Sequence, residues 1–157
     1  MDRRQFVFGA AAFVLAASPV GLVAQAQKKP APPPPPPAMK VYLTPTCGCC
    51  GKWVEHLTAA GFKVTREVTT NLDGVAERQR VPEQLRTCHT AVVGPYLVEG
   101  HVPADVVQKM LKEKPKIAGI AVPGMPIGSP GMEGPNPRPY SVVAFKADGT
   151  TYEFARK

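Results

Sequence analysis

Residues 44–53, TPTCGCCGKW, hold three of the four cysteines of a 157-residue chain within four positions. Cys47 and Cys50 have the C-x-x-C spacing of redox-active dithiols. Cys49 stands between them as a third thiol, which would capture mixed disulfides and invite wrong pairings in a simple exchanger. Three converging thiolates instead form a soft ligand set that suits Cu(I). The segment therefore predicts a Cu(I) site, in which Cys47 and Cys50 would carry any thiol redox chemistry.

Three other interpretations of the cysteines stay open. Four cysteines in an exported protein often form two disulfides, and the sequence leaves three connectivities open. Zinc also suits a Cys₄ or Cys₃His set, although structural zinc sites usually use two separated pairs rather than three cysteines and one. A thiol-disulfide oxidoreductase would use Cys47 as its nucleophile and Cys50 as its resolving thiol.

The segments around the cysteines predict an α/β fold. Residues 39–43 form a short apolar run typical of a buried strand, and residues 52–60 place apolar side chains at helical spacing before Gly61. Residues 62–68 alternate apolar and polar, as a half-buried strand does. The remaining predicted elements are a weak helix over residues 71–85 broken at Pro82, strands over 90–94 and 96–102, a helix that starts at Pro103, an irregular Gly/Pro-rich loop after Pro115, and a hairpin of residues 141–145 and 150–154.

The order of these elements is β-α-β-α-β-β-α with a terminal hairpin. A strand-helix-strand unit requires a right-handed crossover between parallel strands, and this order is the thioredoxin arrangement. The three clustered cysteines then lie between the first strand and the first helix. Cys88, in RTCHTAVV, precedes the third strand and would face the cluster from the other side.

Histidine and methionine offer further ligands. His101 follows Cys88 in VEGHVPAD and is the stronger nitrogen candidate, ahead of His89. Met125 and Met132 carry thioether sulfurs in the Gly/Pro-rich loop, where packing is the simpler interpretation. His56 is expected on the surface of the first helix, and Trp53 is expected in the core.

The N-terminus has the pattern of an export signal over residues 1–26. Arg3 and Arg4 precede an apolar run, and Ala24-Gln25-Ala26 supplies the small-x-small pattern of a cleavage site. The paired arginines resemble a twin-arginine signal. A membrane anchor is the alternative, because the run approaches the roughly 18 residues that a spanning helix needs. Cleavage would leave a periplasmic protein with no stable membrane span.

Residues 27–38 predict a semi-rigid, proline-rich linker, since residues 32–37 are six consecutive prolines without backbone donors. Residues 39–157 then form the metal-binding domain. The net charge is +7, but Lys and Arg are scattered singly without a basic stripe. Together with the export signal, this argues against a nucleic-acid partner.

Four ordered blocks, TPTCGCCGKWVEHL, TCHTAVV, YLVEGHVPADVV and IAVPGMPIGSPGME, resemble the CopG-type periplasmic copper-resistance proteins, a family also described as metal-binding. The resemblance runs from about residue 39 to about residue 145. It implies a variant thioredoxin fold whose C-x-C-C cysteines bind copper, with a suggested part in interconverting Cu(I) and Cu(II). Carried over, the metal ligands fall on five residues: Cys47, Cys49, Cys50, Cys88 and His101.

We therefore expect an exported protein that holds Cu(I) and acts in copper resistance or homeostasis. The partners expected are copper ions and other periplasmic copper-handling proteins. Enzymatic turnover as a copper or thiol oxidoreductase is compatible with this expectation, and the oxidoreductase that uses Cys47 and Cys50 is the alternative function.

Overall fold

The computed structural model describes residues 37–157. The export signal predicted for residues 1–26 lies outside the described residues, as does the predicted linker except for its last two residues. The described elements are β1 (Ala38–Leu43), α1 (Gly48–Ala59), β2 (Lys63–Val68), α2 (Leu72–Arg78), the 3₁₀ turn η1 (Glu83–Leu85), β3 (His89–Val93), β4 (Tyr96–Glu99), α3 (Ala104–Glu113), β5 (Gly119–Ala121), β6 (Ser141–Phe145) and β7 (Thr151–Arg156).

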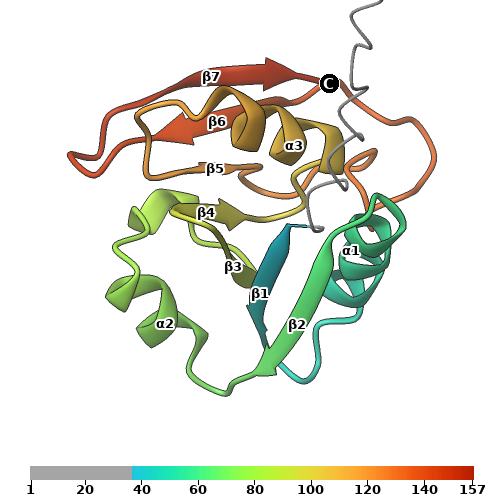
Figure 1. Ribbon diagram of the computed structural model, residues 1–157. Helices are drawn as coiled ribbons and strands as arrows, with labels where there is room; N and C mark the ends of the chain where they lie inside the picture. The colour runs from blue at the N-terminus through green and yellow to red at the C-terminus, as the bar shows by residue number, and fades with distance from the viewer. Residues whose placement is uncertain (1–36) are drawn as a thin grey trace, which may run out of the picture. The chain divides into compact units, whose positions relative to one another are not determined.

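Within residues 37–157 the strands form one seven-stranded sheet in the order β2-β1-β3-β4-β5-β6-β7 (Figure 1). β1 pairs in parallel with β2 and antiparallel with β3. β4 pairs in parallel with β5, and the other neighbours are antiparallel. The predicted α/β class is confirmed, whereas the thioredoxin-like assignment stays a prediction.

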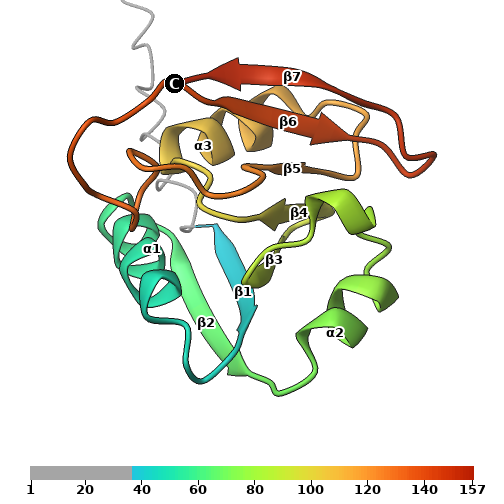
Figure 2. The same ribbon diagram turned by 180° about the vertical axis from the view of Figure 1, so that it is seen from behind.

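The two faces of the sheet carry separate apolar clusters. α1 and α3 cover one face and α2 lies against the other, as Figures 1 and 2 show from opposite sides. Successive residues of a strand point to opposite faces, so β3 gives Ala91 and Val93 to the larger cluster and Val92 to the smaller one. This larger cluster contains Trp53 from α1 and lies beside the cysteine segment.

α1 begins earlier than the sequence predicts. The sequence predicts a helical pattern from residue 52, after a loop that carries the cysteine cluster, with Cys50 at the first turn. The structure starts the helix at Gly48, with Cys47 at the N-cap position. The predicted end is confirmed, because the helix closes at Ala59 and Gly61 has the positive φ of +91° that favours glycine. The difference matters because Cys49, as well as Cys50, lies in the first helical turn.

The expectation that the chain after Pro115 is irregular is wrong at one point. β5 lies there and joins β4 to β6, which makes the terminal hairpin part of the main sheet. A Cβ atom at Gly119 would come within 2.4 Å of the Leu97 carbonyl oxygen and 2.6 Å of the Phe145 ring. The backbone therefore passes through a gap that only glycine fits. In the sequence, a glycine in a Gly/Pro-rich segment indicates a loop instead, which is why the strand was not predicted.

β2 is less buried than its alternating pattern predicts. It is an edge strand, five of its six residues are exposed, and only Val64 is half-buried. Phe62, the most apolar residue of the predicted strand, is buried but precedes β2. The alternation of apolar and polar residues thus predicts the strand correctly, but its position at the sheet edge leaves it mostly exposed.

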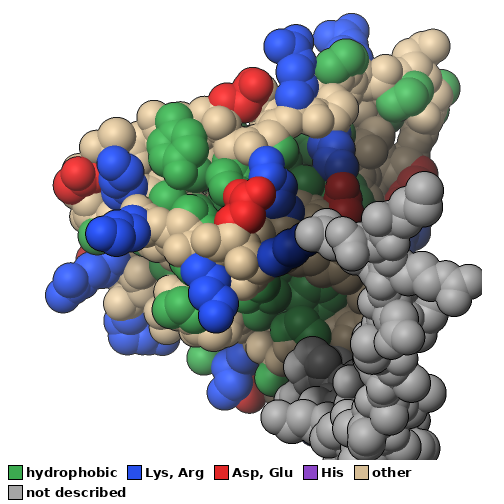
Figure 3. Space-filling view, turned by 45° about the horizontal axis from the view of Figure 1, so that its top comes forward, with side chains coloured by type: hydrophobic (Ala, Val, Ile, Leu, Met, Phe, Trp, Pro, Cys, Tyr) green, Lys and Arg blue, Asp and Glu red, His purple; other side chains and the backbone are tan. Residues whose placement is uncertain are grey.

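The surface carries mixed charge. Lys and Arg side chains are spread over the face shown in Figure 3, with Asp and Glu among them. No helix in residues 37–157 has the length and apolar character needed to cross a membrane.

Candidate metal centre

The N-cap residue and the first turn of α1 supply three of the four sulfur atoms. Cys47 has extended backbone angles (φ −79°, ψ 90°) at the N-cap position, and Cys49 and Cys50 follow inside the helix. The N–H groups of a first helical turn have no intrahelical partner, and with the helix dipole they favour negative charge. Thiolate sulfurs are therefore stabilised at this end of α1.

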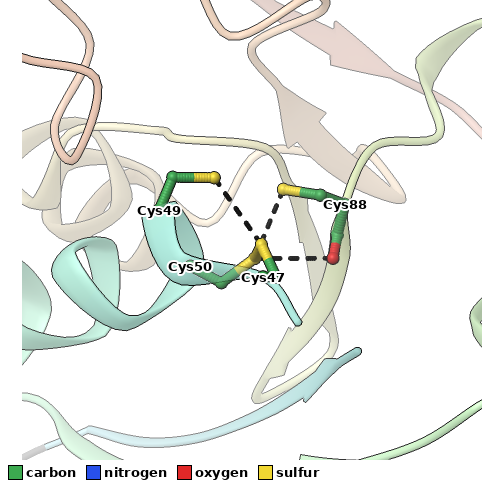
Figure 4. A group of neighbouring side chains, drawn as sticks. All are labelled: Cys47, Cys49, Cys50 and Cys88. Carbon is green, nitrogen blue, oxygen red and sulfur yellow. Dashed lines mark hydrogen bonds between the residues drawn. A yellow bond between two sulfur atoms is a disulfide. The ribbon is translucent and has the colours of Figure 1, made fainter. Parts of the chain in front are cut away.

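The sheet register brings the fourth sulfur to the same place. β3 runs antiparallel to β1, and His89 at its start pairs with Leu43 at the end of β1. Cys88 directly precedes His89, so it stands beside the turn that leads from β1 into α1. Its Sγ lies 3.3 Å from Cys50 Sγ (Figure 4). The predicted approach of Cys88 from the far side of the cluster agrees with this geometry.

The four sulfurs lie within 4.8 Å of one another. Cys47 and Cys50 form a disulfide, while Cys49 and Cys88 are free. Cys49 Sγ lies 3.6 Å from Cys47 Sγ, so each sulfur of the disulfide has a free thiol beside it. All four cysteines of the chain thus converge at one point. They do not form the two-disulfide framework that the sequence left open.

Two buried imidazoles border the sulfurs. His101 Nε2 lies 4.0 Å from Cys88 Sγ, and His89 Nδ1 lies 3.7 Å from the same sulfur. With Cys50 and Cys88 they form a second group of donor atoms within 4.8 Å of one another. His89 was the weaker candidate from the sequence, yet it is as close as His101. His56 is exposed, as expected, and its Nε2 accepts a hydrogen bond from the Ala104 N–H at 3.0 Å.

Burial sets the protonation of these groups. It lowers the pKa of His89 to about 3, with a smaller contribution from the neighbouring His101, whose own pKa is also lowered by burial. Both rings are therefore neutral at physiological pH and keep a lone pair for a cation. Burial, with Cys49 as the next cause, raises the pKa of the Cys88 thiol to about 12. A bound cation would reverse this preference, because it deprotonates a coordinating thiol.

Trp53 has a second role that the sequence does not reveal. It is fully buried, as expected of a core residue, but its ring stacks on His89 with centroids 4.2 Å apart. Its Nε1–H donates to the Val102 carbonyl at 2.8 Å. The tryptophan thus ties α1 to the strand that carries His89 and to the segment after His101.

The Gly/Pro-rich loop packs against the site. Met125 Sδ lies 3.3 Å from Cys88 Sγ. Gly131 is buried, and a Cβ atom there would lie 2.9 Å from the Cys49 carbonyl oxygen and 3.1 Å from the Trp53 backbone nitrogen. Met132 is half-buried. Its carbonyl accepts a hydrogen bond from the Gly128 N–H, and its own N–H donates to the Ser129 carbonyl within the loop. Of the two predicted methionine candidates, Met125 is the one whose sulfur contacts a cysteine of the cluster.

Glu99 is a buried acid that was not among the candidate residues expected from the sequence. Its Oε2 accepts a hydrogen bond from the Thr87 N–H at 3.2 Å, and the Thr87 hydroxyl lies 3.2 Å from the same oxygen. Its Oε1 has no partner among the described residues. Because Thr87 precedes Cys88, this carboxyl group holds the segment that carries the fourth sulfur. A charged residue at the end of an otherwise apolar strand is the one signal that the sequence offers for it.

These features define an α/β protein with a cysteine cluster able to hold a metal ion. A family model described as "Protein of unknown function, DUF411" matches residues 85–132. No curated protein matches the chain. Two solved structures, named copper resistance protein CopG in Form 2 and in Form 1, are each 43% identical to it. Each match covers 78% of this chain and 98% of the other, with a TM-score of 0.73.

The chain therefore belongs to the CopG copper-resistance family, and the predicted resemblance is confirmed. The matching structures and the cysteine cluster together support a copper-related function.

Proposed function

We propose that this protein is an exported copper-binding protein that holds Cu(I) on Cys47, Cys49, Cys50 and Cys88, with His101 as a further ligand. The observation that carries the proposal is the convergence of four sulfurs from two distant segments within 4.8 Å. Thiol-disulfide exchange needs two sulfurs, whereas Cu(I) prefers a set of soft thiolates. Zinc would accept the same cysteines, but the copper-resistance proteins that the chain resembles favour copper as the cargo.

The site can also change the oxidation state of copper. When Cys47 and Cys50 pass from two thiols to a disulfide, they release two electrons and two protons. Two Cu(II) ions accept these electrons and become two Cu(I) ions, which the remaining thiolates, Cys49 and Cys88, favour. The disulfide of the structure corresponds to the product state of this step. Such a step would lower the amount of free Cu(II) in copper resistance or homeostasis.

The place of action in the proposal is the periplasm, because residues 1–26 carry the pattern of a cleavable, twin-arginine-like signal. The predicted linker of residues 27–38 would then separate the folded domain from the point of cleavage. We further interpret the segment from β1 to α3, in the order β1-α1-β2-α2-β3-β4-α3, as a thioredoxin-like unit, since the clustered cysteines lie where its first strand leads into its first helix. Copper-handling proteins of the same compartment are the proposed partners.

The test is an anaerobic titration of the fully reduced protein with Cu(I) against a chromophoric Cu(I) chelator. The reduced protein should withdraw Cu(I) from the chelator, and Cys49→Ser should weaken binding because one soft ligand is lost. Gly149→Ala, in the turn between β6 and β7, serves as a control remote from the cysteines. Weak binding that Cys49→Ser does not change would reject the proposal.

The alternative function is a thiol-disulfide oxidoreductase, which the Cys47–Cys50 disulfide favours. Cys50 is fully buried and Cys47 is partly exposed, as a resolving thiol and a nucleophile would be. This function predicts metal-independent reduction of insulin disulfides that Cys47→Ser abolishes and Cys49→Ser does not. Copper-free protein without this activity would exclude it.

A further inference from the structure

The disulfide has one sulfur that only the protein itself can reach. Cys50 is fully buried, so a thiol from outside has no access to its Sγ. Cys88 Sγ nevertheless lies 3.3 Å from it. A disulfide is exchanged when a thiolate attacks one of its two sulfurs. The geometry therefore places an internal nucleophile against the buried end of the disulfide.

We propose that Cys88 is an internal resolving cysteine that moves the disulfide from Cys47–Cys50 to Cys50–Cys88. Because burial raises the pKa of Cys88 to about 12, the thiol is mostly protonated at neutral pH, and the attacking species is the small fraction that has given its proton to solvent. This thiolate attacks Cys50 Sγ. The Cys50–Cys88 bond forms while the Cys47–Cys50 bond breaks, and the electron pair of the broken bond leaves on Cys47 Sγ. Cys47 then takes up a proton or remains a thiolate. The step is an isomerisation, so it consumes no external oxidant or reductant.

The local structure favours this direction. The leaving sulfur, on Cys47, stands at the N-cap position of α1, where the free N–H groups of the first turn stabilise a thiolate. A better stabilised thiolate leaves faster in exchange. Cys88 lies in the short irregular segment between η1 and β3, where its side chain can turn without breaking a helix or strand. Cys49, at 3.6 Å from Cys47, is the more distant of the two free thiols.

The exchange changes which thiols are available at the surface. Before it, one free thiol belongs to α1 and the other to the segment before β3. After it, Cys47 and Cys49 form a free dithiol, both partly exposed, with sulfurs that lie 3.6 Å apart in the structure. Two thiolates suffice to hold a soft ion, so the oxidised protein would still take one Cu(I). This second part rests on the proposed function, and the exchange itself does not.

Tryptic peptide mapping separates the two disulfides. Trypsin releases Cys47, Cys49 and Cys50 in one peptide, residues 41–52, and Cys88 in another, residues 87–109. The Cys47–Cys50 bond therefore stays within a peptide, while the Cys50–Cys88 bond links two. The purified, metal-free protein carrying one disulfide is incubated anaerobically, quenched in acid, alkylated at low pH, digested and analysed by mass spectrometry. Mixing with ¹⁵N-labelled protein identifies links between separate molecules.

The expected result is a linked pair of peptides from within one molecule, absent in Cys88→Ser, whose amount rises several-fold when chelator-buffered Cu(I) is added. In Cys49→Ser, the amount of the linked pair should no longer rise when Cu(I) is added. Absence of the linked pair with and without Cu(I) would overturn the exchange, even if the reduced protein binds copper tightly. A linked pair that does not respond to Cu(I) would overturn the coupling to copper. In neither case does the result depend on the affinity of the reduced site.

Discussion

Trp53 and His89 stack with ring centroids 4.2 Å apart and planes 28° apart, although they come from α1 and β3. Both side chains are fully buried. α1 and its N-cap residue carry three of the cysteines, and β3 follows directly on the fourth, so this contact fixes the two sulfur-bearing segments against each other. His101 lies beside this pair, with its ring centroid 5.6 Å from that of His89 and 6.5 Å from that of Trp53. The alignment of the candidate ligands therefore depends on an aromatic contact in the core.

Trp53→Phe should destabilise the metal-free protein. Phenylalanine keeps a ring against His89 but cannot donate to the Val102 carbonyl, which then remains buried without its partner. The expected loss is about 1–3 kcal/mol in the free energy of unfolding. Urea unfolding followed by circular dichroism measures it, since the variant lacks the only tryptophan. A change below about 0.5 kcal/mol would show that the Trp53 hydrogen bond contributes nothing.

Gly131→Ala should loosen the loop over the site. Gly131 has a φ of +88°, and an added Cβ would crowd the Cys49 carbonyl oxygen at 2.9 Å. Gly149→Ala is a matched control, because Gly149 has a φ of +84° but open space around the position of a Cβ. In both variants the free energy of unfolding should fall by about 1–2 kcal/mol, because alanine is strained at a positive φ. In Gly131→Ala it should fall by about 1–3 kcal/mol more, because the added Cβ overpacks the contact.

The same pair of variants reports on access to the cysteines. Displacement of the loop should make Cys49 react faster with a maleimide in Gly131→Ala, while Gly149→Ala should react at the wild-type rate. Equal stability and equal reactivity of the two variants would contradict the packing of the loop on α1.

The pH dependence of stability should reveal the buried Glu99. Burial raises the pKa of Glu99 from 4.5 to about 7, so the folded protein holds this proton more tightly than the unfolded chain. The contribution of Glu99 to stability is therefore complete below pH 4.5 and is lost as the pH rises through 7. Glu99→Gln cannot ionise. Its stability relative to wild type should increase between pH 4.5 and pH 7.

His89 does not disturb this comparison. Burial lowers the pKa of His89 from 6.5 to about 3, so its contribution is present above pH 6.5 and is lost as the pH falls toward 3. Wild type and Glu99→Gln share this pH dependence of stability from His89, so it cancels when the free energies of unfolding of the two proteins are subtracted. Chemical unfolding of metal-free protein at several pH values measures that difference. A pH-independent difference would show that Glu99 titrates alike in both states.

The sequence predicted the meeting of the sulfurs because order along the chain determines it. A strand, a helix and an antiparallel return strand place the start of β3 beside the start of α1, and Cys88 lies at that start. The stacking of His89 and the burial of Glu99 could not be predicted, since the strand pattern does not tell which neighbours meet each face. β5 was not predicted because a strand of only three residues, one of them glycine, is too short to show an alternating apolar pattern. Edge position, rather than pattern, decided the exposure of β2.

In the proposed site, sulfur atoms from both α1 and the segment before β3 bind the same Cu(I). Copper K-edge X-ray absorption of the reduced protein loaded with Cu(I) tests it most directly, with Cys88→Ser prepared in parallel. A shared site should give a first shell dominated by sulfur in the wild type and fewer sulfur scatterers per copper in Cys88→Ser. A first shell of nitrogen and oxygen, or an identical sulfur shell in both proteins, would contradict it.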